Sequence, residues 1–254
     1  MNAISKIIIN SIENNRKIII PEYLKNNLSI SDGYFLQKEI NDFFSKKNEF
    51  KAWKIGCTTP VMQKYLGISN PCLGKVMSKN LHKGNTNINF ESFSRPGVEC
   101  EIAVILSEDY LHDKTFMNLE DVISKVVPAI EIVDDRWENY KEENTPLLIS
   151  DNFFSSSIVF GRGTDKIDIK NLKNLKGFME VNNQLIGKGI GKDILEDPLN
   201  ALKWFLDFKF DKNNLPKAGD IISLGSIVET YWVSKNDKVS MNIDELGSVE
   251  VSFI

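Results

Sequence analysis

Two glutamates interrupt an otherwise apolar stretch between residues 95 and 106. Side chains alternate between the two faces of a strand, so Glu99 and Glu101 lie on one face and the apolar residues between them lie on the other. Ionised carboxylates are costly on a buried strand unless they pair with a charge or bind a cation. The spacing therefore predicts two oxygen ligands side by side.

A third glutamate, Glu131, lies in a similar β-branched run. Three carboxylates on apolar strands indicate a site for a hard divalent cation, Mg²⁺ or Mn²⁺, because Zn²⁺ more often recruits His or Cys. The chain has only two histidines. The residues alone leave another interpretation open, in which these acids pair with Lys or Arg or occupy the solvated face of an antiparallel strand.

Lys54 is a candidate for proton transfer. It stands between Trp53 and Ile55 in a segment typical of a short strand. Partial burial there would lower the pKa of the ammonium group and suit it to acid-base chemistry. The alternative is a surface or ion-paired lysine whose stem covers apolar neighbours.

The elements that must position these residues are mainly strands. Helical spacing predicts helices over residues 3–15, 31–47, 58–66, 118–126 and 198–207, and a turn over 187–191. Strand patterns cover residues 86–92, 98–106, 127–134, 156–161, 176–182, 221–224 and 238–243. Helices at the start followed by many strands predict an α+β protein, with an N-terminal helical or α+β lobe over 1–80 and a β-rich, metal-binding catalytic domain over 81–254.

Composition narrows the class of protein. The chain has 254 residues, 42% hydrophobic content and a net charge of −4, with basic residues scattered rather than clustered. This is typical of a globular protein and carries no electrostatic signature of nucleic-acid binding. The first twenty residues contain charges and only short apolar runs, so we expect no signal peptide or membrane span and a cytoplasmic location. Three cysteines without paired spacing fit reduced thiols.

Several short motifs, in this order, resemble the 2-keto-4-pentenoate hydratase and 4-oxalocrotonate decarboxylase family of the fumarylacetoacetate hydrolase superfamily. They span most of the chain: residues 34–37, 54–58, 62–63, 66–67, Pro71 with Gly74, 98–103, 129–136, 151–152, 187–191, 197–202, 218–221 and 225–226. The resemblance implies a fumarylacetoacetate hydrolase-like mixed β-sandwich or roll with a helical N-terminal lobe. It also implies that Glu99, Glu101 and Glu131 hold Mg²⁺ or Mn²⁺ and that Lys54 lies in the active site.

The resemblance implies a lyase acting on a 2-oxo acid or its dienol tautomer. A hydratase would protonate a 2-hydroxy-2,4-dienoate at its far carbon and add water at C4, giving a 4-hydroxy-2-oxo acid. Metal chelation by the substrate would polarise its carbonyl. Lys54 would transfer the proton, and Asp151 or Asn152 would orient substrate or water. A homo-oligomer is implied as well, with a related decarboxylase or an aldolase as a further partner.

Three alternatives stay open at this point. A 4-oxalocrotonate-type decarboxylase uses the same enolate chemistry, and an acylpyruvate hydrolase or an inactive partner subunit of a lyase complex rank after it. Two departures from the family pattern bear on them. No carboxylate occurs in residues 75–80, where family members often carry one, and Phe153 and Phe154 replace small residues, which indicates a pocket of altered size.

Overall fold

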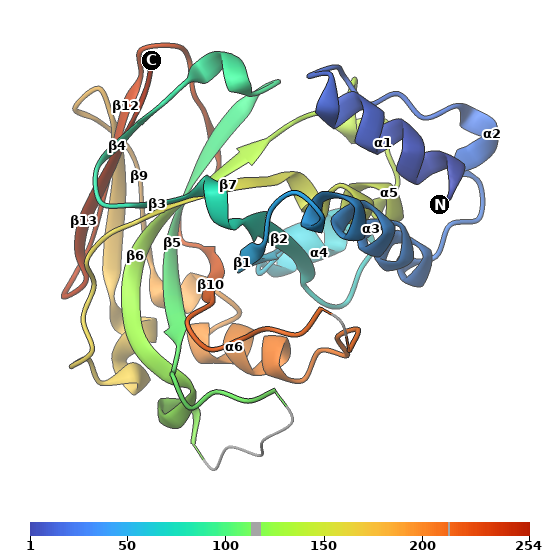
Figure 1. The fold of residues 1–254 in the computed structure, drawn as a ribbon. Coiled ribbons are helices and arrows are strands. Elements are labelled where there is room, and N and C mark those ends of the chain that lie inside the picture. The colour runs from blue at the N-terminus through green and yellow to red at the C-terminus, as the bar shows by residue number, and fades with distance from the viewer. Residues whose placement is uncertain (113–117, 213) are drawn as a thin grey trace.

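Two β-sheets form the centre of the protein, and the N-terminal helices lie beside the larger one (Figure 1). The computed structural model describes residues 1–112, 118–212 and 214–254. The larger, 8-stranded sheet has the order β2-β1-β10-β5-β6-β7-β3, with β11 paired to β5, and the smaller, 5-stranded sheet has the order β4-β13-β12-β8-β9. The expected α+β fold with mixed sheets and a helical N-terminal part is confirmed.

The described residues form the following helices and strands. The α-helices are α1 Ala3–Glu13, α2 Glu22–Lys25, α3 Ile30–Ser45, α4 Pro60–Leu66, α5 Thr145–Ser150 and α6 Pro198–Leu206. The strands are β1 Phe50–Gly56, β2 Cys72–Met77, β3 Leu81–Lys83, β4 Thr86–Ile88, β5 Pro96–Leu106, β6 Ile123–Asp134, β7 Ser155–Phe160, β8 Lys176–Val181, β9 Gln184–Ile190, β10 Ile221–Ser226, β11 Tyr231–Trp232, β12 Lys238–Ile243 and β13 Gly247–Phe253.

The two faces of β5 and β6 have different surroundings. Ile102 and Ile130 belong to the main apolar core, together with Met179 and Met241 of the smaller sheet. The glutamates alternate with these core residues and therefore lie on the opposite face, where small side chains such as Ala103 line the sheet. Period-two alternation thus separates a dry core from a polar face.

The N-terminal helices pack around a second apolar cluster and attach it to the larger sheet. In α3, Leu36 and Ile40 join this cluster, while Gln37 Nε2 donates hydrogen bonds to the carbonyls of Leu73 in β2 (2.7 Å) and Ile149 in α5 (2.8 Å). β1 and β2, both within the first eighty residues, are strands of the larger sheet. A domain boundary at residue 80 stays a prediction.

Three local predictions were wrong. The helix expected over 118–126 is a 3-10 turn at Leu119–Val122, after which β6 begins, because the β-branched residues that follow pair with β5. The strand expected over 86–92 ends at Ile88. The turn expected over 187–191 lies mostly in β9, an edge strand of the smaller sheet. Strand pairing overrode weak local patterns in the first and third cases, whereas in the second a 3-10 turn at Phe90–Ser92 follows the strand.

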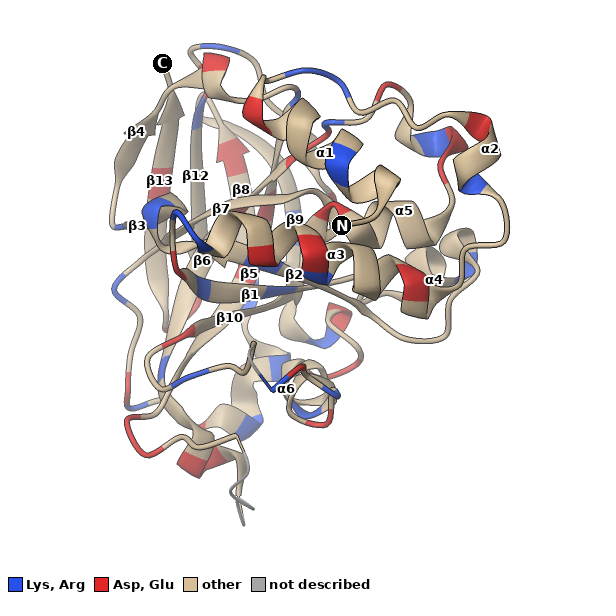
Figure 2. Cartoon of the chain, turned by 45° about the vertical axis from the view of Figure 1, so that its right-hand side comes forward, with Lys and Arg blue, Asp and Glu red and all other residues tan. Residues whose placement is uncertain are grey.

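Charged residues of both signs are interspersed over the helices and loops (Figure 2). Among the described residues, no helix combines the length and the apolar character that crossing a membrane requires.

Lys75 is a buried lysine on β2, outside the glutamate cluster. Its Nζ donates to Asn214 Oδ1 (2.9 Å) and lies 4.1 Å from the centre of the Trp53 ring. Burial outweighs the nearby acids, Asp220 foremost, and lowers the pKa of Lys75 from 10.5 to about 8.

We expect Lys75→Met to change the pH dependence of stability. Between pH 8 and 10.5 the unfolded chain binds the proton of Lys75 more strongly than the folded chain, so this group makes the free energy of unfolding rise with pH, by about 3 kcal/mol in total. Lys75→Met removes that rise. Urea unfolding of both proteins at pH 7 and pH 10.5 measures it, and equal pH dependence in the two proteins would contradict the assignment.

Candidate metal centre and active site

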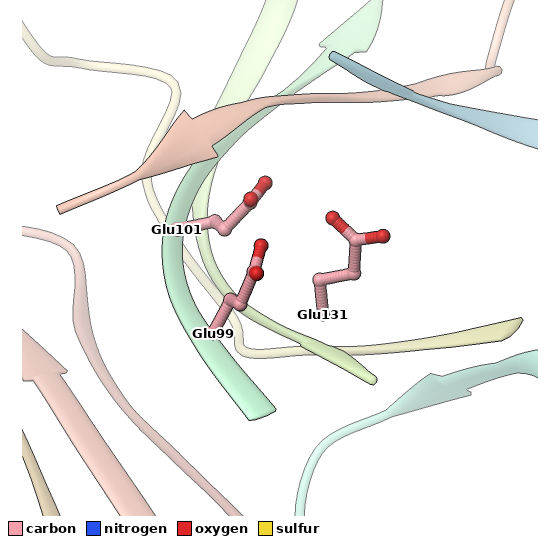
Figure 3. A group of neighbouring side chains, drawn as sticks. All are labelled: Glu99, Glu101 and Glu131. Atoms are coloured by element: carbon pink, nitrogen blue, oxygen red, sulfur yellow. The ribbon is translucent and has the colours of Figure 1, made fainter. Parts of the chain in front are cut away.

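Glu99, Glu101 and Glu131 converge on one point of the larger sheet. One carboxylate oxygen from each lies within 4.8 Å of the others, and Figure 3 shows the three side chains extending from neighbouring strands toward a common space. The register of β5 and β6 sets this arrangement, because Glu99 is directly opposite Glu131. Glu101 and Glu131 are buried, while Glu99 is half-buried.

Two hydroxyl groups orient the carboxylates of β5. Ser223 on the central strand β10 donates to Glu101 Oε2, and Thr230, just before β11, donates to Glu99 Oε1. Neither residue was predicted from the sequence. The signal for Ser223 was a single polar residue within the apolar run of β10, since a buried hydroxyl needs a hydrogen-bond partner.

Lys54 reaches the same cluster from β1. Its Nζ lies 3.0 Å from Glu131 Oε1, and the residue is only 2% exposed. The parallel pairing of β1 with β10 places Lys54 next to Ser223 and explains this position. Burial alone would lower the pKa of Lys54, but the surrounding carboxylates, Glu131 foremost, outweigh it and raise the pKa above its ordinary value. The expected lowering was therefore wrong for these surroundings, because the sequence did not reveal how closely the acids approach.

This cluster of Glu99, Glu101, Glu131 and Lys54, termed here the carboxylate–lysine site, fits a divalent cation. With all three carboxylates ionised, as metal binding requires, they and the ammonium group carry a formal charge of −3 + 1 = −2. Both oxygens of Glu131 are buried, and Oε1 has the Lys54 ammonium group 3.0 Å away. Burial, then Glu131 and Glu99, raises the pKa of Glu101 well above its usual range. Clustered carboxylate oxygens whose negative charge one lysine only partly balances are suited to Mg²⁺ or Mn²⁺.

Asp151 and Asn152 make extensive contacts within the protein. Arg136 Nε lies 2.9 Å from Asp151 Oδ1 and 3.0 Å from Oδ2, and burial raises the pKa of Asp151 to about 6 although Arg136 acts in the opposite direction. Asn152 Oδ1 accepts from Lys75 N and from Asn41 Nδ2, both at 3.1 Å, and its own Nδ2 donates to Asn41 Oδ1 (2.7 Å). These bonds tie β2, α3 and the loop after β6 to the segment that follows α5.

A cleft with a volume of about 640 Å³ borders this segment. Asp151, Asn152 and Arg136 line it, together with residues of α1 and α3, and its lining includes neither Lys54 nor the three glutamates. Asp151 and Asn152 therefore line this cleft, which does not reach the carboxylate–lysine site.

Asn152–Phe154, termed here the left-handed turn, has three consecutive non-glycine residues with positive φ, at 52°, 50° and 65°. This conformation costs roughly 1–2 kcal/mol for each such residue. The carbonyl of Asn152 lies so close to β2 that a Cβ on Gly74 would be 2.3 Å from it, so only glycine fits at that position. The turn places the Phe153 ring centre 5.5 Å from Lys54 Nζ. Strain that is held in place by neighbours often marks a functional segment.

Comparisons with known proteins agree on one family. Residues 76–254 match the family described as Fumarylacetoacetate (FAA) hydrolase C-terminal. The chain is 28% identical over 235 residues to 2-keto-4-pentenoate hydratase 1 of Dechloromonas aromatica (strain RCB), covering 91% of this chain and 89% of that protein. It is 24% identical over 231 residues to a 4-oxalocrotonate decarboxylase of Pseudomonas putida, covering 89% and 86%.

The fold comparison is consistent with these matches. The structure of 4-oxalocrotonate decarboxylase from Pseudomonas putida G7, complexed with magnesium and adipate, superposes with a TM-score of 0.88 at 24% identity, covering 99% of this chain and 96% of that one. Sequence and fold together show that the chain belongs to the 2-keto-4-pentenoate hydratase and 4-oxalocrotonate decarboxylase family of the fumarylacetoacetate hydrolase superfamily.

Proposed function

We propose that the protein is a divalent-metal-dependent hydro-lyase that converts a 2-hydroxy-2,4-dienoate into a 4-hydroxy-2-oxo acid. The proposal rests mainly on the mostly buried cluster in which Lys54 lies beside three carboxylates. Together these four groups have a formal charge of −2. The similarity to 2-keto-4-pentenoate hydratases supports hydration as the reaction.

Glu99, Glu101 and Glu131 would hold the metal, Mg²⁺ or Mn²⁺. When bound, this ion supplies Lewis acidity that polarises the 2-oxo carbonyl of the substrate. Ser223 and Thr230 fix the carboxylates of β5 in place. The mostly buried surroundings limit the access of bulk water to the reacting atoms.

Lys54 Nζ holds the proton that the substrate receives. In the first step Lys54 Nζ gives a proton to the far carbon, C5 of a five-carbon dienoate, and a C–H bond forms there. The 2-hydroxyl becomes the 2-oxo group, and its proton passes to the neutral amine of Lys54, which is thereby restored. Water then adds across the C3–C4 double bond, with its hydroxyl on C4 and its proton on C3. The Glu131 carboxylate, 3.0 Å away, keeps the ammonium group beside the substrate.

Asp151 and Asn152 act in this proposal mainly as positioning residues. Their side chains are bonded to Arg136 and Asn41 and hold the left-handed turn beside Lys54. The role suggested by the sequence, direct orientation of substrate or water, stays a prediction. The cytoplasmic location, the homo-oligomer and the association with a related decarboxylase or an aldolase likewise stay predictions.

Decarboxylation of 2-oxohex-3-enedioate is the second candidate. The sequence similarity to 4-oxalocrotonate decarboxylases favours it, and the same acids and lysine would serve it. It differs from the hydratase reaction in the second carboxylate that its substrate carries at the far carbon.

One experiment separates these reactions. Metal-stripped protein is given 2-hydroxypenta-2,4-dienoate or 2-oxohex-3-enedioate, with and without Mg²⁺ or Mn²⁺, and the ultraviolet absorbance, the product and released CO₂ are followed. We expect metal-dependent loss of the dienoate with 4-hydroxy-2-oxopentanoate as product. CO₂ release from the diacid alone would establish the decarboxylase instead. No turnover of either substrate would overturn the proposed function and favour an acylpyruvate hydrolase or an inactive partner subunit.

A further inference from the structure

The Phe153 ring forms one wall beside the carboxylate–lysine site. Its centre lies 5.5 Å from Lys54 Nζ, and its Cδ1 would be 3.2 Å from a Cβ on Gly56, two residues further along β1. Phe153 is 7% exposed and belongs to the apolar cluster that the N-terminal helices build, which includes Cys72 and Leu147. One side of the ring thus faces the lysine and the other side is supported by packed side chains.

The left-handed turn keeps this ring in place. Asn152 is bonded to Asn41 and to the backbone of β2, so the residue before the phenylalanine is anchored on two sides. The residue after it, Phe154, packs edge to face against Phe153 (5.4 Å between ring centres) and against Tyr140 (5.5 Å). The residues on both sides of Phe153 have left-handed backbone and make these contacts. Rotation of the ring away from Lys54 would therefore require the turn itself to rearrange.

Proton transfer from Lys54 determines which part of the substrate lies against the Phe153 ring. A carbon that accepts a proton from Nζ must come within hydrogen-bond distance of it, and a substituent on that carbon then comes close to the Phe153 ring. The ring has a negative face and offers no hydrogen-bond donor to a carboxylate. A second substrate carboxylate on that carbon would meet this ring and the Glu131 carboxylate, which lies 3.0 Å from Nζ, and neither can donate a hydrogen bond to it.

We propose that Phe153 is a specificity-determining residue that restricts the substrate to a monocarboxylic dienoate with little or no substitution at its far carbon. The inference rests on the proposed function and deepens it, because it names the substrate class. It places 2-hydroxypenta-2,4-dienoate among the accepted substrates and disfavours longer dienoates and dicarboxylic acids.

The test compares substrates in wild type, Phe153→Ala and Phe153→Gly. The ratio of kcat/KM for 2-hydroxypenta-2,4-dienoate to that for 2-hydroxyhexa-2,4-dienoate, which carries one more methyl group, is measured in each protein. We expect both variants to lower the ratio by about 10-fold or more, the range typical of a methyl group in a tight pocket. Phe153→Gly guards against misfolding, since glycine adopts the positive φ at this position without strain.

Binding provides a readout that does not depend on turnover. The dissociation constants of the saturated analogues 2-oxopentanoate and 2-oxohexanedioate are measured by calorimetry in the presence of Mn²⁺. Wild type is expected to bind the monoacid at least about 10-fold more tightly, and Phe153→Ala is expected to reduce that preference.

Phe43→Ala is the matched control, because Phe43 is a half-buried phenylalanine packed against the same apolar cluster, and its ring contacts Phe44 rather than Phe153. Its ratios should stay within about twofold of wild type. An unchanged ratio in the Phe153 variants, or an equal change in Phe43→Ala, would overturn the inference while leaving the hydratase intact. Absence of any turnover in wild type would instead overturn the proposed function. The ratio of the dissociation constants of the two analogues, compared between wild type and Phe153→Ala, would then test the role of Phe153 separately.

Discussion

Lys54→Met is expected to lower hydratase turnover by about 10²–10⁴-fold, the usual contribution of a positioned acid-base group. The same variant should bind Mn²⁺ about 10-fold more tightly than wild type, because the ammonium group and a dication compete for the carboxylate of Glu131, 3.0 Å from Nζ. Steady-state kinetics and calorimetric Mn²⁺ titration measure these opposite changes. A lysine with only a structural role would leave turnover of the folded protein close to wild type.

Lys54→Arg separates charge from proton transfer. Arginine keeps the positive charge beside Glu131 but does not release a proton in the working pH range. We therefore expect low turnover together with Mn²⁺ affinity near that of wild type. High activity in Lys54→Arg would show that charge alone is needed and would remove Lys54 as the proton donor.

Glu101→Gln is expected to weaken Mn²⁺ binding by at least about 100-fold. Loss of groups that only support metal ligands already costs 10–100-fold, and Glu101 supplies an oxygen to the centre of the cluster. The metal-free variant should melt at a higher temperature than metal-free wild type, because burial and the neighbouring carboxylates raise the pKa of Glu101 and show that its ionised form is disfavoured. Ser223 can still donate to the amide oxygen of the glutamine.

Thermal unfolding with and without Mn²⁺ tests both parts of this prediction. Wild type should gain about 2.7 kcal/mol of stability at a metal concentration of 100 times its Kd, and the variant should gain far less. Glu180→Gln is the matched control, since Glu180 is a half-buried glutamate on β8 of the other sheet. Equal Mn²⁺ affinity in Glu101→Gln and wild type would exclude Glu101 as a ligand.

Local physical rules account for the parts of the fold that the sequence predicted well. Helix α6 was expected within one residue, because Asp197 caps its start, Pro198 occupies the first turn and Leu202 and Phe205 share one buried face. β5 and most of β6 were expected from their β-branched runs. The start of β6 was missed, because there pairing with β5 outweighs a weak helical pattern.

The sequence by itself determined that Glu99 and Glu101 share a face of one strand, since alternation is a property of the backbone, and motif order pointed to the family. Only the tertiary structure decided that Glu131 and Lys54 lie beside Glu99 and Glu101, because the strand order β1-β10-β5-β6 depends on pairing between segments that are distant in the sequence. It also decided the direction of the pKa shift of Lys54 and the place of Phe153 beside it. Charge interactions and packing depend on distances through space, which spacing along the chain does not specify.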